Sequence, residues 1–479
     1  MLARMLIILV GMMILVTCFA CGSREVDIPE AEPQESLEIP VEDEVIEDEA
    51  TIVISAELLF ELQEVEFLKD FEPIDERHAM WAYDIAQLRN RVFTLHPKFN
   101  DERIMHLEQN IVIGMEFDES IKALIKNVPE LTDFEIKSYL QRSIAILRDN
   151  HTNFFASEPS FLQESYPLNF GLFYDGFYLY QSSADFTDAL NLRLVSINDI
   201  PLDIVFKEYS GFFSNENIYD AKSSFAAMLS VPNVLKAIGV TADNGTTYTF
   251  DDGSSSGLSI TLTDTVAWSL EGDFAEPLED KRAEGDLPLF LRRRLNAQGY
   301  IFLREFDTLY IRVHSFAYPC FDTIDRIQDF VTENSDDIHA VILDARGNLG
   351  GMPTHYSNLF TWITEFIPDV KIFYFMDEAS RSASVLVGGH LIDLGATTVG
   401  QPAGQNTNMY ASIGANDRII RLKYSGLELF VSFDFFTAGI HDFDAIDMVL
   451  YPDVLIDYTI DDWINNHDPL LEYVIDLLR

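Results

Sequence analysis

Two successive stretches between residues 338 and 408 show the same order of apolar and polar residues. In the first, the apolar run Ile338–Leu343 is followed by the glycine-rich segment Asp344–Gly351. In the second, the apolar run Lys371–Met376 is followed by the serine-rich segment Glu378–Ser384. Apolar runs of this length, closed by turn residues, are typical of strands buried on both faces of a sheet. The pattern predicts two strand-turn-helix units whose turns meet at one sheet edge.

The same kind of pattern continues on both sides of these units and predicts an α/β domain over residues 271–479. The further elements predicted for it are the strands Thr308–Val313, Thr397–Gly400, Ile419–Lys423 and Leu427–Ser432, and the helices Ile324–Val331, Val385–Leu394 and Asp468–Leu478.

Residues 56–160 carry a helical pattern instead. Apolar residues recur at three- and four-residue steps within 74–92, and two further helices are predicted at Ile121–Val128 and Asp133–Leu147. Thr132 is placed to cap the last of them, with a glutamate at the offset of a capping box. We expect a small helical domain.

Residues 161–270 show mostly strand patterns, with one helical stretch at Leu202–Tyr209. The turn Gly253–Gly257 matches the Gly-x-Ser-x-Gly nucleophile elbow of α/β-hydrolases. That elbow belongs between a buried strand and a helix, whereas this one lies in a polar hairpin, so we interpret the match as coincidental and an esterase of that type as disfavoured. The predicted strands are Phe177–Gln181, Leu192–Ile197, Thr246–Phe250 and Leu258–Leu262.

The N-terminus has the pattern of a secretory signal, which predicts a signal peptide over residues 1–20. A basic start precedes the apolar core Leu6–Val16, and small residues lead to Cys21. A cysteine in this place resembles the lipidated residue of a bacterial lipoprotein, with Cys18 as the alternative position. We expect a lipid-anchored protein on the extracytoplasmic face of a bacterial cell membrane. An ordinary cleaved signal or an N-terminal anchor helix is the alternative.

Composition narrows the range of partners. Residues 21–55 are acidic and lack an apolar period, which predicts a disordered tether. The formal net charge of −47 repels nucleic acid phosphates and argues against nucleic acid as a partner. Only Cys320 lies in the body, and no zinc-type Cys/His spacing occurs, so we expect no internal disulfide, metal or cofactor. The oligomeric state is left open.

The serine-rich turn offers a candidate nucleophile. Ser382 is predicted to lie where a strand ends and a helix begins, which directs its hydroxyl toward the sheet edge and its free amides. Ser380 and Ser384 flank it, so position alone leaves three choices. A helix cap is the simpler interpretation of such a cluster.

His151 is the candidate base, because a serine hydroxyl is inert at neutral pH without one. It follows a predicted helix and precedes an apolar stretch, where a residue can line the rim of a cleft. His355, just after the glycine turn, and His390, within a helix, are less well placed. A surface or capping role is the simpler interpretation of an isolated histidine.

The glycine turn offers candidate oxyanion donors. The amides of Gly350 and Gly351 are unhindered by side chains and precede the next helix. Two aligned N–H groups would stabilise a developing negative charge by several kcal/mol in a dry site.

Several of these segments resemble the tail-specific, or C-terminal-processing, serine peptidase family. Val341–Gly351 has that family's order of hydrophobic strand, Asp, Arg, Asn and Gly-Gly. Ser380–Ser384, with Gly400-Gln401-Pro402 downstream, is similar to the nucleophile segment, and Ser382 matches the nucleophile.

Two more segments extend the resemblance. Asp149–Thr152 resembles the Asp-Gly-His-Thr element of members with a histidine base, the tricorn-core relatives, and Tyr451-Pro452-Asp453 is similar to a Pro-Asp element near the family's C-terminus. The resemblance implies a crotonase-like (ClpP/crotonase-type) α/β catalytic core, a helical N-terminal domain and a β-rich, PDZ-like middle module. It also implies a serine-type endopeptidase that cleaves peptides or proteins.

The chain departs from the family pattern in two places. Residues 400–406 contain no lysine, although many members use a lysine there as base, so activity would depend on His151. The acid that orients the histidine in tricorn-like members has no clear counterpart, and Asp444 and Asp447 are the candidates. These departures motivate an alternative, a catalytically inactive relative that binds hydrophobic peptides or lipids in the same cleft.

Overall fold

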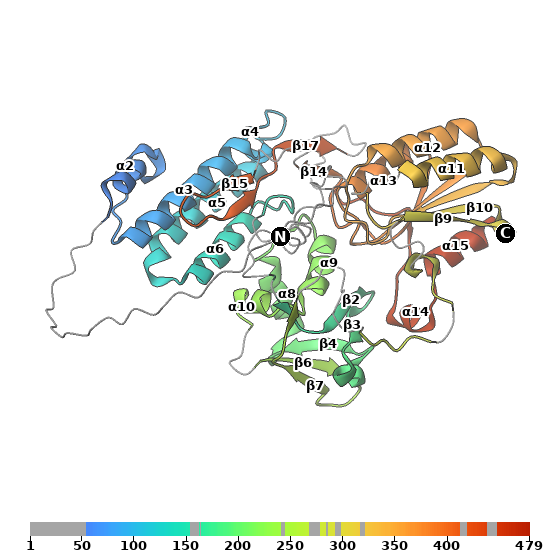
Figure 1. Ribbon diagram of the computed structural model, residues 1–479, viewed down its shortest axis with the longest axis horizontal. Coiled ribbons are helices and arrows are strands. Elements are labelled where there is room, and N and C mark those ends of the chain that lie inside the picture. Colours follow the sequence, from blue (N-terminus) through green and yellow to red (C-terminus); the bar gives the residue numbers. More distant parts are fainter. Residues whose placement is uncertain are drawn as a thin grey trace, which may run out of the picture.

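The computed structural model shows a helical part, a β-rich part and an α/β part along the chain (Figure 1). Both lipidation candidates, the signal peptide and nearly all of the predicted tether lie outside the described residues. None of the helices within the described ranges is long and apolar enough to cross a membrane. The structure describes residues 54–153, 162, 164–240, 245–267, 278–283, 286–292, 298–316, 321–411, 419–437 and 448–479.

The α/β part is built on a sheet with the strand order β18-β13-β12-β11-β10-β9. All neighbours are parallel except β9, which pairs antiparallel with β10 at the edge. The predicted bounds of β10, β12 and β13 are confirmed, and β9 was not predicted. The strands are β9 (Gln298–Leu303), β10 (Thr308–Val313), β11 (Ala340–Asp344), β12 (Lys371–Met376), β13 (Thr397–Gly400) and β18 (Val454–Leu455).

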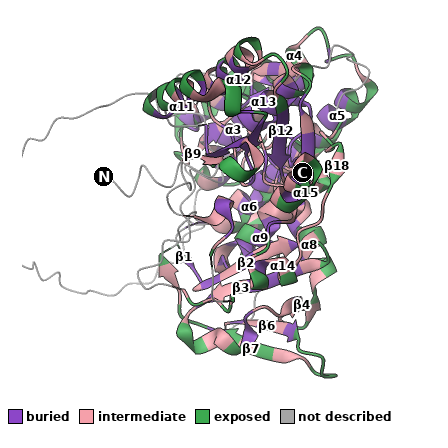
Figure 2. Ribbon diagram, turned by 90° about the vertical axis from the view of Figure 1, so that its right-hand side faces the viewer, coloured by how far each residue is buried: buried purple, intermediate pink, exposed green. Residues whose placement is uncertain are grey.

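Helices cover both faces of this sheet, which explains its uninterrupted apolar runs. Val341 and Leu343 of β11 pack in a cluster with α11, α12 and α13, whereas Ala340 and Ile342 pack with α15 on the opposite face. Figure 2 shows buried residues along β12 in the middle of the sheet. The helices are α11 (Phe321–Asn334), α12 (Thr354–Phe366), α13 (Ala383–Asp393), α14 (Ile460–Asn465) and α15 (Pro469–Leu478).

The helical part confirms the prediction of a helical N-terminal region. The Thr132–Glu135 capping box at the start of α6 is present. Helix α5 begins well before the predicted start at Ile121. The sequence did not predict its first turns, because Asn110 and Gly114 on the buried side interrupt the apolar pattern. The helices are α2 (Ala56–Glu64), α3 (Glu76–Leu95), α4 (Pro97–Asn100), α5 (Glu108–Asn127) and α6 (Asp133–Ala145).

The β-rich part holds an antiparallel sheet with the order β2-β3-β4-β6-β7, and β5 pairs with β4. It carries the helices α8, α9 and α10 where the sequence predicted only one. Helix α9 escaped prediction because its buried side includes the polar Asp220 and the small Ala221 and Ala226. The PDZ-like assignment stays a prediction. The elements are β2 (Leu168–Phe173), β3 (Gly176–Ser182), β4 (Arg193–Ile197), β5 (Ile200–Pro201), α8 (Leu202–Ser210), α9 (Ile218–Met228), α10 (Pro232–Ala237), β6 (Thr246–Asp251) and β7 (Leu258–Leu262).

A hairpin late in the chain packs on the N-terminal helices. Its strands β15 and β16 share one core cluster with these helices and the β-rich part, and Figure 1 shows β15 beside α3. The Asp84 carboxylate of α3 accepts hydrogen bonds from the backbone N–H groups of Tyr424 and Ser425. Sequence-distant segments therefore fix the helical part to the rest of the molecule. The remaining strands are β1 (Glu164–Ser165), β8 (Val266–Ala267), β14 (Asn408–Ala411), β15 (Ile419–Arg421), β16 (Glu428–Phe430) and β17 (Asp434–Thr437).

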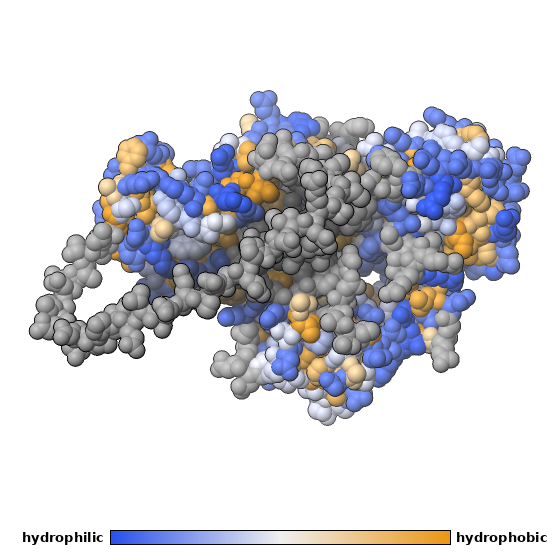
Figure 3. Space-filling view, viewed as in Figure 1, coloured by the Kyte–Doolittle hydropathy of each residue, from blue (hydrophilic) through white to orange (hydrophobic). Residues whose placement is uncertain are grey.

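Hydrophilic residues are spread over the described surface of all three parts on the face that Figure 3 shows, with smaller apolar patches between them. This surface is in keeping with the large excess of acidic residues in the sequence.

Candidate active site

Ser382 lies between β12 and α13 in a conformation that few residues adopt. Its φ of 51° and ψ of −122° place a non-glycine residue in a sparsely populated region, and it is the N-cap of α13. Such strain costs about 1–3 kcal/mol and persists only where surrounding contacts impose it, which makes it a pointer to function. The Ser382 side chain makes no hydrogen bond to any described residue.

The two flanking serines have structural partners. The Ser380 hydroxyl is 3.2 Å from the Asp377 carboxylate, and the Ser384 hydroxyl is 2.7 Å from the hydroxyl of Tyr374. Geometry thus distinguishes Ser382 from its neighbours, which the sequence pattern alone did not do.

The glycine turn lies directly against Ser382. A Cβ atom on Gly350 would lie 2.5 Å from Cβ of Ser382 and 3.0 Å from its Oγ, so only glycine fits there. Gly350 also has a φ of +113°. Its N–H donates to the side-chain oxygen of Asn348 at 2.8 Å, whereas the N–H of Gly351 meets no acceptor among the described residues. Of the two predicted oxyanion donors, the structure leaves Gly351 available and Gly350 occupied.

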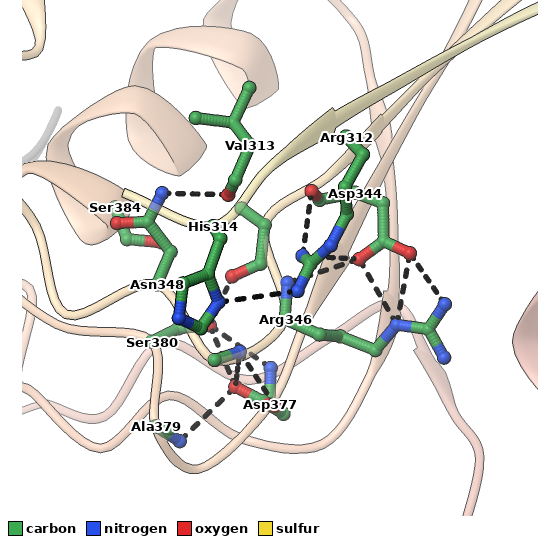
Figure 4. Close-up of polar contacts among 12 residues, drawn as sticks. Arg312, Val313, His314, Asp344, Arg346, Asn348, Asp377, Ala379, Ser380 and Ser384 are labelled. Carbon is green, nitrogen blue, oxygen red and sulfur yellow. Dashed lines mark hydrogen bonds and ion pairs between the residues drawn. The ribbon is translucent and has the colours of Figure 1, made fainter. Parts of the chain in front are cut away.

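Hydrogen bonds tie the glycine turn to the serine turn (Figure 4). The Asp377 carboxylate accepts from the N–H groups of Gly347 and Ala379. The Arg381 N–H donates to the Asn348 carbonyl at 3.0 Å. The strand-end turns that the sequence predicted to meet therefore form one connected unit.

A network of buried ion pairs lies next to the two turns, at the end of β11. The Asp344 carboxylate, at the end of β11, accepts from Arg346 and Arg312 and from the hydroxyl of Tyr310, and Arg346 also pairs with Asp468 at 3.0 Å. Burial alone would raise the pKa of Asp344, but the two guanidinium groups and the hydrogen bonds lower it to about 2. Asp344 and Arg346 of the segment that resembles the peptidase signature thus form buried ion pairs next to the glycine turn.

His151 lies in an irregular turn after α6, held by two distant segments, one around Ser214 and one at Phe430 and Ser432. The Asp149 N–H donates to the Ser214 hydroxyl, the Ser432 N–H donates to the Thr152 hydroxyl, and Asn153 exchanges backbone hydrogen bonds with Phe430. No regular element carries the histidine, so its position depends on tertiary packing.

Asp149 is buried between two histidines. Its carboxylate accepts from Nε2 of His96 at 3.1 Å, from the Thr152 hydroxyl at 2.6 Å and from the His151 backbone N–H at 3.0 Å. Burial alone would raise the pKa of Asp149, but its hydrogen bonds and the neighbouring imidazoles hold it at about 2. Asp149 is therefore an anion that fixes the backbone of the His151 turn.

Two carboxyl groups face Nδ1 of the His151 ring. Asp149 lies 3.9 Å from it and Glu216 lies 4.0 Å from it. Asp444 and Asp447, the predicted orienting acids, lie outside the described residues. Glu216 had no local signal in the sequence, because it lies in the loop before α9 and its carboxyl group meets Gln405 and His151, which are distant in the chain.

Burial sets the charge state of these groups. It lowers the pKa of His151 below its usual 6.5, so the ring is neutral at neutral pH and able to accept a proton. Burial, together with the negative charges of Asp149 and Asp220, raises the pKa of Glu216 well above its usual range. Glu216 thus favours the protonated form next to a neutral imidazole.

One glutamine connects the two halves of the site. The Ser382 backbone N–H donates to Oε1 of Gln405, and Nε2 of Gln405 donates to Glu216 at 2.6 Å and lies 3.4 Å from Nδ1 of His151. No hydrogen bond joins the His151 ring directly to Ser382 Oγ. The structure therefore brings the predicted nucleophile and base together, with one carboxamide between them.

Asp220 makes a second connection. Its carboxylate pairs with Arg381 at 2.8 Å, beside Ser382, and accepts from the Asn150 side chain at 3.2 Å, beside His151. Of the other histidines considered, His390 bonds the Thr361 hydroxyl, and His355 follows the glycine turn at the start of α12.

A metal could in principle be held by Asp149, His151 and Glu216, whose ligand atoms lie within 4.8 Å of one another. Their polar atoms already take part in hydrogen bonds within the protein, including those from His96 and Gln405. We therefore assign no metal to this cluster.

Comparison with known proteins gives a fold. No model of a protein family matches the sequence, and no curated protein matches it. Among solved structures, mature CPAF aligns over 84% of this chain and 96% of its own, with a TM-score of 0.55 at 11% identity. Mature CPAF complexed with lactacystin aligns over 84% and 98%, with a TM-score of 0.53 at 12% identity. The photosystem II D1 C-terminal processing protease aligns over 83% and 97%, with a TM-score of 0.39 at 12% identity. The chain thus has the CPAF fold.

Proposed function

We propose that the chain is a serine peptidase in which Ser382 is the nucleophile and His151 the general base. The observation that carries the proposal is the Gln405 carboxamide, which contacts both the Ser382 amide and the His151 ring. The likeness to tail-specific peptidase motifs and the fold shared with CPAF, one structure of which holds lactacystin, support it. The histidine-base, tricorn-like branch and a crotonase-like core belong to the same proposal.

The reaction follows from these roles. Ser382 Oγ attacks the carbonyl carbon of the scissile peptide bond while His151 accepts the hydroxyl proton. The proton passes to the leaving amine as the C–N bond breaks, and an ester remains on Ser382. A water molecule that loses its proton to His151 hydrolyses the ester, which frees the new carboxyl terminus and restores the serine hydroxyl.

Backbone amides would stabilise the oxyanion of this reaction. We assign as donors the amide of Gly351, which meets no acceptor among the described residues, and the amide of Ser382 at the start of α13, whose present acceptor is the Gln405 side chain. Gly350 instead keeps space free beside the nucleophile. Glu216 and Asp149 are the described acids that can receive a hydrogen bond from Nδ1, while Asp444 and Asp447 remain predictions.

The test is labelling of the full chain with a fluorophosphonate, with the modified residue located by mass spectrometry. We expect labelling on Ser382 that is lost in Ser382→Ala and kept in Ser380→Ala and Ser384→Ala, which serve as matched controls. Absence of labelling in folded protein that binds hydrophobic peptides or lipids would favour the inactive relative instead. Labelling on another serine would overturn the assignment.

Membrane tethering is a separate part of the proposal. A lipid on Cys21, or on Cys18, would anchor the folded body on the extracytoplasmic face through the acidic segment at 21–55. Expression in a bacterium fed radiolabelled palmitate tests it. Incorporation that is lost in Cys21→Ala but kept in Cys18→Ala supports Cys21 as the lipidated residue, and the reverse result supports Cys18. If the unchanged protein incorporates no palmitate, the lipid anchor is rejected.

A further inference from the structure

The Gln405 side chain lies between the candidate nucleophile and the candidate base. It is fully buried, its Oε1 accepts from the Ser382 backbone N–H, and its Nε2 points toward His151 and Glu216. The orientation of the carboxamide is fixed at both ends, because an amide N–H can only donate and the Ser382 N–H needs an oxygen. Its carbonyl oxygen thus lies on a donor assigned to the oxyanion, and its nitrogen faces the base.

We propose that Gln405 is a built-in plug, whose carboxamide occupies the place of the scissile amide until an extended peptide main chain displaces it. The inference rests on the proposed function, since it names what must leave the site before Ser382 can react. The substrate carbonyl would take over the hydrogen bond from the Ser382 N–H, and Nδ1 of His151 would be released.

The plug also holds the base in an unproductive form. Because Nε2 of Gln405 can only donate, Nδ1 of His151 must be the accepting nitrogen, and the ring proton of the neutral imidazole then lies on Nε2. In this tautomer Nδ1 cannot donate to Glu216 or Asp149. Removal of the carboxamide lets the proton move to Nδ1, where these acids lie 4.0 and 3.9 Å away, and leaves Nε2 free to accept the Ser382 proton.

The backbone around Gln405 is held independently of its side chain. The side-chain amide of Asn217 donates to the Ala403 carbonyl at 3.3 Å and to the Asn406 side chain at 3.0 Å. The Thr407 N–H donates to the Met448 carbonyl at 2.8 Å. The position of this segment therefore does not depend on the hydrogen bonds of the Gln405 carboxamide.

The first experiment compares fluorophosphonate labelling rates of the full chain and its Gln405→Ala variant. We expect the rate constant for Ser382 to rise about tenfold, because the three hydrogen bonds of the Gln405 carboxamide no longer have to break before the site opens. Gln401→Ala is the matched control, since Gln401 lies on the same segment but bonds Ile456 and Asp457, and its rate should be unchanged. A Gln405→Ala rate no higher than that of the unchanged protein would overturn the plug.

A second readout does not depend on reactivity. In ¹⁵N-histidine NMR spectra of Ser382→Ala, we expect Nδ1 of His151 to be unprotonated, and in Ser382→Ala/Gln405→Ala we expect it to carry the proton. Nδ1 already protonated in the first protein, or no change in the second, would contradict the plug. If no protein labels at Ser382, the peptidase proposal has failed, and the spectra still decide the position and effect of Gln405.

Discussion

The two halves of the candidate site are built in different ways. Ser382 lies at the end of a parallel sheet, in a turn bonded to the neighbouring strand-end turn and supported by the buried pairs of Asp344 with Arg312 and Arg346. His151 lies in an irregular turn that Ser214 and other residues far away in the chain hold in place. The nucleophile half is a product of one domain, whereas the base half exists only when separate parts of the molecule pack together.

Because of this difference, we expect substitutions in the two halves to affect different properties, stability in one half and activity in the other. Substitutions beneath Ser382 should damage the fold, because they leave charges buried without partners. Substitutions at the His151 ring should damage the reaction while the fold survives, since backbone contacts rather than the ring hold that turn. The predictions below test this division.

The largest effect should come from removal of the imidazole. In His151→Ala we expect kcat/KM for a peptide substrate to fall on the order of 10⁴-fold, since the variant lacks the base that we assign to the Ser382 proton. The free energy of unfolding should change by about 1 kcal/mol or less. Peptide kinetics and urea unfolding on the same preparation check both. A small loss of kcat/KM together with a large loss of stability would contradict the assignment of His151 as the base.

In the half of the site that holds Ser382, a substitution should lower the stability of the fold. Asp344→Asn should lower the free energy of unfolding by about 3–5 kcal/mol, because Arg312 and Arg346 lose a buried countercharge. Asp251→Asn, which breaks a half-exposed pair with Arg193, is the control and should cost about 1 kcal/mol or less. Urea unfolding of both variants measures the difference. Equal losses would show that the network gives no special support.

The next largest loss of activity should follow from disturbing the close packing between the glycine turn and Ser382. Gly350→Ala would place a methyl group 2.5 Å from Cβ of Ser382, so the nucleophile must move. We expect kcat/KM to fall about 100-fold, the usual result of a misplacement of about 1 Å. Gly426→Ala shares a positive φ but has open space around it, so activity should be retained. Full activity in Gly350→Ala would place the reacting serine elsewhere.

The smallest effect concerns the pH dependence of the base half. The pKa of Asp149 is lowered from 3.8 to about 2 by folding, so its ionised form stabilises the native state above about pH 4. That contribution, about 2–3 kcal/mol, should be lost as the pH falls from about 4 toward 2. The stability gap between the unchanged protein and Asp149→Asn should therefore close over this range in urea unfolding. A gap independent of pH would show that Asp149 is not the ionised anchor.

The sequence allowed one half of the site to be predicted well and the other only in outline. Apolar runs and their turn residues are local signals, so the strands that lead to Ser382 and the glycine turn were predicted close to their observed bounds. Local signals could not separate Ser382 from its neighbours, because the difference lies in hydrogen bonds to Asp377 and Tyr374.

The residues around His151 show why the rest could not be predicted. Glu216 and Gln405 lie in segments without regular structure, and what they contact is set by packing between sequence-distant parts. The occupied N–H of Gly350 likewise depends on the rotamer of Asn348, which no apolar pattern reveals. The predicted acids Asp444 and Asp447 remain untested.

The most direct test of the central claim is hydrolysis of an unstructured protein by the full chain and by Ser382→Ala, with the newly formed termini followed by mass spectrometry. The account predicts cleavage by the unchanged protein and a loss on the order of 10⁴-fold or more in the variant. Equal cleavage by both proteins would contradict it.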